Sequence, residues 1–165
     1  MARNEAEIGP EHAMPLLGAL LRKPYQVLVG DGIEPALASA GYGDIRSAHF
    51  PVLHALTANP RGLRSTDLAA YARITKQSMG YLVDHLVEGG YVERVQDRGD
   101  GRAKVVRLTE RGWELSQAIR DAVRQVEDDW SNRIGPDRVE HLRQILCDLT
   151  ASFECDPRHH GAAGD

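Results

Sequence analysis

Two arginines in the middle of the chain, Arg98 and Arg102, have the neighbours expected of side chains that bind phosphate. They lie in a stretch of charged residues, glycine and alanine, and each follows an aspartate, Asp97 or Asp100, by one or two positions. Guanidinium groups form paired hydrogen bonds with phosphate oxygens and enter narrow, negative grooves. The stretch therefore predicts a solvent-exposed, anion-binding tip, on which the aspartates orient the arginines and limit unselective binding.

The segments on either side of this tip predict a hairpin that follows a pair of helices. Strand-like runs at 91–95 and 104–108 flank the tip. Before them, Ser65 is a suitable N-cap for a short helix, and Thr75 is one for a helix over 76–88 that Gly89-Gly90 ends. The second helix has an apolar face at helical spacing, formed by Met79, Leu82, Val83, Leu86 and Val87. Two helices, a tight turn and a hairpin form the winged helix-turn-helix plan.

The polar face of the 76–88 helix is the part that could contact bases. Lys76, Gln77 and Tyr81 lie near its N-terminus, where the helix dipole also favours a phosphate. Gly80 leaves room there for close approach to a groove or to a neighbouring helix. Ser65 and Thr66 either cap their helix or contact phosphate, and Arg94 and Lys104 either contact the DNA backbone or pair with Glu93. The candidate DNA-binding residues are Ser65, Thr66, Thr75, Lys76, Gln77, Ser78, Tyr81, Arg94, Arg98, Arg102 and Lys104.

The charge distribution favours one anion-binding surface on an otherwise acidic body. The formal net charge is -4 over 165 residues. From Arg61 to Arg111 there are ten basic and seven acidic residues, whereas the remainder has ten basic and seventeen acidic ones. The basic excess thus surrounds the predicted hairpin.

The two ends of the chain predict long helices with apolar stripes. One lies at about 11–40 with a break or kink near Lys23 because of Pro24, and a shorter helix follows at about 47–58. After the hairpin, Thr109 caps a long helix, Gly135-Pro136 interrupts it, and a last helix runs to about 153 with Leu142, Leu146 and their apolar neighbours facing inward. These stripes either fold onto the core of a monomer or interlock in a two-fold dimer. We expect the dimer, because the stripes are too apolar to face water.

Residues 11–153 resemble the MarR family of bacterial transcription regulators. The matching segments are Leu68-Ala69, the helix at 75–88, residues 90–94, the wing at 97–102 and residues 108–112. The wing is similar to the family pattern Asp-x-Arg-Asp-x-Arg, except that Gly99 stands where the middle arginine would be and Arg98 takes a neighbouring place. Arg73 stands where the turn often has glycine. A positive φ there would cost on the order of 1 kcal/mol.

The resemblance implies a mainly α fold with a small β-hairpin wing, a winged helix-turn-helix lobe and dimerisation helices at both termini. The expected organisation is a helical arm at 11–45, a DNA-binding lobe at 46–110, C-terminal dimerisation helices at 111–153, and flexible tails at 1–10 and 154–165. It also implies a homodimer on a pseudo-palindromic operator of double-stranded DNA. A small aromatic or phenolic effector would release a repressor of this kind, although a regulator without any effector also fits. The alternative is a protein-interaction module that has lost DNA binding, which the net charge supports.

Other kinds of site find less support in the residues. A candidate effector pocket is formed by Tyr25, Tyr42, His49 and Trp113. The alternative for His49 is that it is a packed or capping histidine without a ligand. The histidines have no compact metal-ligand spacing, so neither a metal nor a cofactor is expected. Cys147 and Cys155 form no disulfide framework, which favours a cytoplasmic protein, and no apolar run reaches 18 residues, so no membrane span is expected. No phosphate loop or catalytic constellation indicates an enzyme.

Overall fold

The computed structural model describes residues 16–97 and 103–154. Its elements in chain order are α1 (Leu17–Gln26), the π-helical segment η2 (Val27–Ile33), α2 (Glu34–Ser39), the 3₁₀ turn η3 (Ser47–His49), α3 (Phe50–Ala58), α4 (Ser65–Ala72), α5 (Lys76–Glu88), β1 (Val92–Gln96), β2 (Lys104–Leu108), α6 (Glu110–Ile134) and α7 (Pro136–Glu154). The predicted fold class, mainly helical with one small hairpin, is confirmed.

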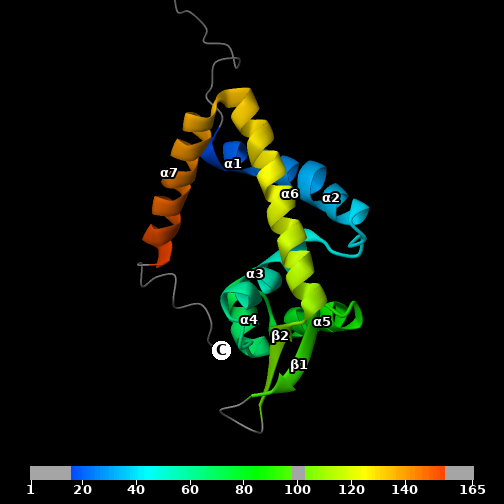
Figure 1. Cartoon of the computed structure of the whole chain (residues 1–165). Coiled ribbons are helices and arrows are strands. Elements are labelled where there is room, and N and C mark those ends of the chain that lie inside the picture. The colour runs from blue at the N-terminus through cyan, green and yellow to red at the C-terminus, as the bar shows by residue number, and fades with distance from the viewer. Residues whose placement is uncertain (1–15, 98–102, 155–165) are drawn as a thin grey trace, which may run out of the picture.

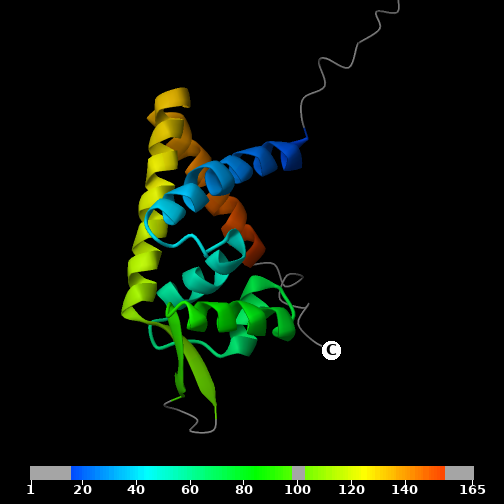
Figure 2. The same cartoon turned by 90° about the vertical axis from the view of Figure 1, so that its right-hand side faces the viewer.

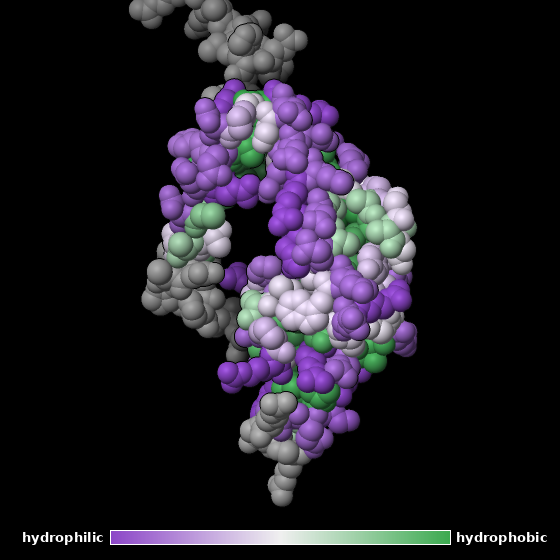
Figure 3. Space-filling view, in the orientation of Figure 1, coloured by the Kyte–Doolittle hydropathy of each residue, from purple (hydrophilic) through white to green (hydrophobic). Residues whose placement is uncertain are grey.

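The long helix α6 connects the two ends of the molecule. At its N-terminal end lie α3, α4, α5 and the hairpin, which we call the lobe, and at its C-terminal end lie α1 and α7 (Figures 1 and 2). Figure 3 shows a mainly hydrophilic surface along α6. The opposite side of α6 has buried residues at helical spacing, among them Leu115, Ala122 and Val126. This helix therefore fixes how the lobe stands relative to the terminal helices.

The first helical arm, residues 17–39, does not break at Pro24 as predicted. The helix continues through Pro24, and the irregular part is the π-helical segment η2 that follows. Proline removes only one backbone hydrogen bond, whereas Gly30 and Gly32 in η2 are weak helix formers. Gly32 also lies against α6, where a Cβ atom would collide with the Cγ2 methyl of Val126. The shape of the arm therefore depends on the glycines of η2 and on the close crossing with α6, and not on Pro24.

The helix boundaries follow the predicted capping residues with one exception. Thr75 caps α5 and Thr109 caps α6, each accepting a backbone N–H three residues later at 3.1 Å. Gly135 ends α6 with φ 95°. The exception is Ser65, which is the first residue of α4, while Arg64 takes the N-cap position without a side-chain capping bond.

The lobe has an aliphatic core on which the hairpin packs. Leu68 and Leu86 are fully buried between α4 and α5, and Val106 of β2 faces the same core. β1 and β2 pair antiparallel with Val95 opposite Val105, and Leu63 adds one further antiparallel bridge to Val106. The hairpin is thereby held at its base from two sides, by the α3–α4 loop and by α5.

The terminal helix α7 differs from the prediction that its apolar residues face inward. Only Val139 is buried in the single chain. Exposed apolar residues follow on the same helix: Leu142, Ile145, Leu146, Leu149 and Phe153. Those on α1 and just before it are exposed as well: Leu16, Leu17, Leu20, Leu21 and Tyr25. One chain thus leaves both terminal stripes uncovered, because α7 packs on α6 over only part of its surface.

Candidate nucleic-acid interface

The turn between α4 and α5 has the backbone expected of a helix-turn-helix. Arg73 ends α4 in the left-handed region, at φ 53° and ψ 43°. The following N–H, that of Ile74, donates to the carbonyl of Ala69 at 3.1 Å and closes the turn. The positive φ of Arg73 costs on the order of 1 kcal/mol for a residue with a Cβ. The turn sets α5 across α4 and leaves the N-terminal end of α5 in solvent.

The N-terminal end of α5 presents polar side chains that the core does not use. Met79, Val83 and Leu86 are buried on the inner face. Lys76, Gln77, Ser78 and Tyr81 are exposed, and 68% of the Tyr81 surface is accessible. The Gln77 amide donates to the Tyr81 hydroxyl at 3.4 Å, which aligns these two side chains along one face of the helix. Such a face offers hydrogen bonds to base edges and, near the helix N-terminus, to phosphate.

Three of the smaller candidate residues are already engaged in capping or local bonds. The Thr75 hydroxyl accepts the Ser78 N–H at 3.1 Å and donates to the Ser78 hydroxyl at 2.9 Å. Thr66 is exposed and donates to Asp67 at 3.4 Å. Ser65 is half-buried at the start of α4. Of these residues, Thr66, Thr75 and Ser78 are exposed.

Ion pairs along the hairpin connect it to α5 and to the residue just before α4. The Arg94 guanidinium donates to the Asp84 carboxylate of α5 at 2.6 Å. Arg64, just before α4, donates to Asp97 at 3.0 Å. The suggested pairing of Glu93 with Arg94 or Lys104 is wrong, because Glu93 accepts from Arg107 opposite it at 2.7 Å. In an antiparallel ladder, alternate residues face opposite sides, so Arg94 points to α5 and Glu93 away from it.

The tip itself, with Arg98 and Arg102, lies outside the described residues. Its two flanking positions are described: the Asp97 N–H donates to the Ala103 carbonyl at 2.9 Å, and the exposed Lys104 pairs with Gln96 across the strands. The hairpin therefore keeps its antiparallel pairing up to the tip, and the arginine prediction remains a prediction.

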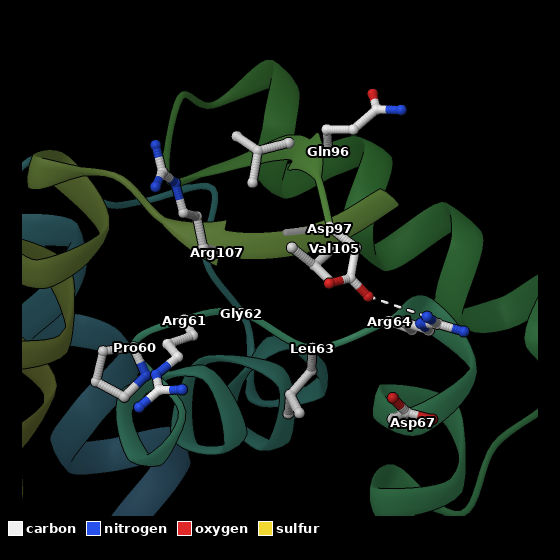
Figure 4. A pocket seen from close by; sticks show the side chains of 11 residues that line it. Pro60, Arg61, Gly62, Leu63, Arg64, Asp67, Gln96, Asp97, Val105 and Arg107 are labelled. Carbon is white, nitrogen blue, oxygen red and sulfur yellow. Dashed lines mark hydrogen bonds and ion pairs between the residues drawn. The ribbon is translucent and has the colours of Figure 1, made fainter. Parts of the chain in front are cut away.

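A groove of about 820 Å³ flanks the hairpin and adds arginines that sequence reasoning missed. Arg61, Arg64 and Arg107 line it, together with the apolar side chains of Val95 and Val105 (Figure 4). Figure 4 shows the Arg64–Asp97 pair on one wall of this groove. The available signal was the basic excess from residue 61 onward, which did not distinguish these arginines from others.

The candidate effector-pocket residues are not brought together as one group. Tyr42 and His49 both lie near Asp44, at the start of the lobe, whereas Tyr25 is exposed on α1 and Trp113 is 38% exposed on the first turn of α6. None of the four lines the groove beside the hairpin or a second hollow of about 400 Å³ between α6 and α7. An effector site formed by all four residues would require a rearrangement or a partner chain.

His49 has the packed, capping role that was the alternative to a pocket. Its Nδ1 accepts the backbone N–H of Arg46 at 3.0 Å, and only 7% of its surface is exposed. The ring stacks on His85 of α5 with centroids 4.7 Å apart. Burial lowers the pKa of His49 below its usual 6.5, and the neighbouring His85 lowers that pKa further. The neutral imidazole is thus the form that this packing favours.

Within 16–97 and 103–154, no three histidine, cysteine, aspartate or glutamate side chains gather as a metal site. No helix in these ranges is long and apolar enough to cross a membrane. Cys147 is an exposed free thiol on α7, and Cys155 falls outside the described ranges.

The fold and this surface define a winged helix-turn-helix protein. A profile described as MarR family matches residues 44–103. The HTH-type transcriptional regulator PetP of Rhodobacter capsulatus is 32% identical over 103 residues, which are 62% of this chain and 61% of that protein. The match thus spans about three fifths of the length of this curated relative. Over these residues the chain is similar to the MarR family, and the matched relative is named a transcriptional regulator.

Solved structures of a related protein agree with this assignment. The MarR family protein Rv2887 of Mycobacterium tuberculosis in complex with DNA is 26% identical, with a TM-score of 0.65 over 82% of this chain and 98% of that one. The same protein in complex with salicylic acid is 28% identical, with a TM-score of 0.63 over 82% of this chain and 97% of that one. The similarity includes the terminal helices as well as the lobe, because it covers far more than residues 44–103.

Proposed function

We propose that this chain is a DNA-binding transcription repressor that places α5 in the major groove and the hairpin tip in the adjacent minor groove. The observation that carries the proposal is the exposed polar end of α5, where Lys76, Gln77 and Tyr81 lie on a helix whose other face is buried. The basic residues along the hairpin and its flanking groove supply the charge that phosphate contacts require. The related protein whose complex with DNA is known supports this use of the fold.

The proposed functional unit is a homodimer formed by the terminal helices. Leu17 of α1 is 68% exposed and Ile145 of α7 is 49% exposed in the single chain, and both belong to continuous apolar stripes. Monomeric proteins rarely leave such stripes in water. A two-fold axis through these helices would set the two copies of α5 about one duplex turn apart and match a pseudo-palindromic operator. In this organisation residues 11–45 and 111–153 serve dimerisation, and residues 46–110 bind DNA.

The proposed release signal is a small aromatic or phenolic effector. A related protein binds salicylic acid, which has this chemistry. An effector acts only by binding one arrangement of the two lobes more tightly than the other. Tyr42, half-buried at the connection between the helical arm and the lobe, is the proposed pocket residue that such a ligand would meet there, whereas His49 is buried and would be reached only after a rearrangement. Thermal-shift screening of aromatic acids separates this regulator from one without an effector, because only the former gains stability.

The proposed DNA contacts are tested by fluorescence anisotropy with a labelled duplex from the DNA directly upstream of the chain's own coding sequence. The double change Lys76→Ala, Gln77→Ala is expected to weaken binding by at least tenfold, since a good base contact contributes about 1–3 kcal/mol. The double change Arg98→Ala, Arg102→Ala is expected to make the slope of log affinity against log salt concentration less steep. The slope should change by about one unit for each phosphate that the variant no longer neutralises.

The matched control is Arg124→Ala. It removes one positive charge from the second half of α6, where Arg124 pairs with Asp121 outside the lobe. Equal losses of affinity in the control and in the α5 variant would mean that only net charge matters. Unchanged affinity in both double variants would reject the proposed contacts.

A further inference from the structure

The stacked pair of His49 and His85 lies where the helical arm meets the lobe, away from the proposed DNA contacts. Their rings are 4.7 Å apart and nearly parallel, at 12°. His49 forms a reciprocal pair with Arg46: its Nδ1 accepts the Arg46 N–H at 3.0 Å, and its own backbone N–H donates to the Arg46 carbonyl at 2.9 Å. A ring nitrogen that accepts a hydrogen bond bears no proton. The geometry therefore requires the neutral ring of His49.

Several elements near this pair contribute a charged or titratable group. His85 Nε2 lies 3.2 Å from the Asp44 carbonyl and 3.5 Å from the Asp44 carboxylate. The Asp44 carboxylate also accepts from the hydroxyl of Tyr91, at the start of the hairpin, at 2.8 Å. Arg111 of α6 lies over the Tyr91 ring at 4.9 Å, and Glu34 of α2 accepts the Ser47 N–H at 3.1 Å. The pair is thus the centre of a polar cluster that joins α2, η3, α5, the hairpin and α6.

A proton on His49 Nδ1 would disrupt this cluster in two ways. It would remove the acceptor of the Arg46 N–H, which holds the first turn of the lobe. It would also place a buried positive charge against the face of His85 and beside Arg46, with Asp44 as the opposite charge. Burial and the neighbouring His85 both lower the pKa of His49, so the proton is taken up only as the cluster opens.

We propose that this histidine pair makes DNA binding proton-sensitive. The neutral pair holds α5 in its binding orientation, and protonation of His49 releases α5 from η3. The inference rests on the proposed function, because α5 carries the proposed base contacts in its first half and His85 in its second half. A helix moves as a rigid unit, so a change at His85 alters the position of Lys76 and Gln77 and, in a dimer, the spacing of the two recognition helices.

The expected change of DNA affinity with pH has the opposite sign to the change that general electrostatics would produce. Acid adds positive charge to any protein and therefore strengthens its attraction to phosphate. Here the His49 pKa is lowered by folding, so the stability of the junction is fully present above about pH 6.5 and is lost as pH falls below it. DNA affinity is therefore expected to decrease with acidification, by roughly three- to tenfold between about pH 7.5 and about pH 5.5.

The test is anisotropy with the same upstream duplex at fixed ionic strength across this pH range. In His49→Asn the amide oxygen replaces Nδ1 as an acceptor that cannot be protonated, so the affinity should no longer fall with acid. In His85→Gln an N–H donor to Asp44 remains but the neighbour that lowers the His49 pKa is gone, so the midpoint of the fall should move to higher pH. The control His54→Asn removes an exposed histidine that bonds Tyr71 at 2.6 Å, outside the cluster, and should keep the wild-type profile.

A second readout separates failure of this inference from failure of the proposed function. NMR titration of the His49 ring and hydrogen exchange of the Arg46 amide are measured on the DNA-free protein. A His49 pKa below 6.5, with Arg46 exchange that accelerates as His49 takes up its proton, supports the switch even if the duplex does not bind. Acid-strengthened binding in the wild type, an unaltered fall in His49→Asn, or a His49 pKa at or above 6.5 overturns it.

Discussion

The Arg94 guanidinium lies 2.6 Å from the Asp84 carboxylate and connects the first strand of the hairpin to α5. The two side chains are 35% and 57% exposed, so water and salt screen the pair. The pair links the hairpin to α5, the two parts of the lobe that are proposed to contact DNA in different grooves. The guanidinium of Arg94, one of the predicted DNA contacts, is therefore already paired with Asp84.

The Arg94–Asp84 pair is expected to contribute little to stability. A double-mutant cycle with Arg94→Ala and Asp84→Ala should give a coupling of about 1 kcal/mol or less in the free energy of unfolding, decreasing with added salt. Asp84→Asn should tighten binding to the upstream duplex at low salt, because it frees Arg94 and removes a negative charge beside the DNA. Weaker binding in Asp84→Asn, measured by anisotropy, would show that alignment by the ion pair matters more than the charge.

Two glycine substitutions are expected to have opposite effects on stability. A Cβ at Gly80 of α5 would meet open space, whereas one at Gly32 would collide with Val126 of α6. Gly80→Ala should raise the free energy of unfolding by about 0.5–1 kcal/mol, because alanine is the better helix former. Gly32→Ala should lower it by about 1–3 kcal/mol through overpacking. Denaturant unfolding measures both, and equal effects would contradict the helix crossing described for the arm.

The sequence predicted local features of the fold better than its long-range contacts. The bounds of α5 and the caps at Thr75 and Thr109 were correct, because capping and apolar periodicity act within one or two turns. The partner of Glu93 and the π-helical segment η2 were missed. Both depend on neighbours brought close by folding, Arg107 across the hairpin and Val126 across the helix crossing.

The candidate site shows the same division. Helical periodicity correctly assigned Lys76, Gln77 and Tyr81 to an exposed face. No local pattern could place His49 against His85, because their contact depends on how the start of the lobe packs on α5. Arg61 and Arg107 likewise come together only because Leu63 pairs with Val106.

Dimerisation through the terminal helices is expected to depend on the exposed stripe of α7. Ile145→Glu would place a charge in the middle of that stripe, where Ile145 is 49% exposed in the single chain. The variant should sediment as a monomer and lose most of its affinity for the duplex. Gln125→Glu, which adds the same charge at an exposed position of α6, should remain dimeric. A wild-type monomer in sedimentation equilibrium, or a dimer that survives Ile145→Glu, would rule out this interface.

Tyr91 is expected to contribute a specific alkaline dependence of stability. Its side chain is fully buried, and burial raises the pKa of the phenol above the ordinary 10.0. The unfolded chain then loses this proton first, so the contribution to the free energy of unfolding is present below about pH 10 and is lost as pH rises through the folded-state pKa. Tyr91→Phe also removes the 2.8 Å hydrogen bond to Asp44 and should cost about 1 kcal/mol at neutral pH.

The measurement for Tyr91 is the difference in unfolding free energy between wild type and Tyr91→Phe across alkaline pH. This difference should shrink above about pH 10, since only the wild type has the phenol to ionise. A constant difference over that range would mean that folding does not perturb the phenol.

Selection of bound duplexes from random DNA tests the central claim most directly. A dimer that places α5 of each copy in the major groove should enrich a pseudo-palindromic sequence whose half-sites lie about one helical turn, roughly 10 base pairs, apart. Lys76→Ala, Gln77→Ala should lose that enrichment, and Arg124→Ala should keep it. Recovery of no sequence preference by the wild-type protein, at low salt and neutral pH, would contradict the proposal that this chain is a sequence-specific DNA-binding regulator.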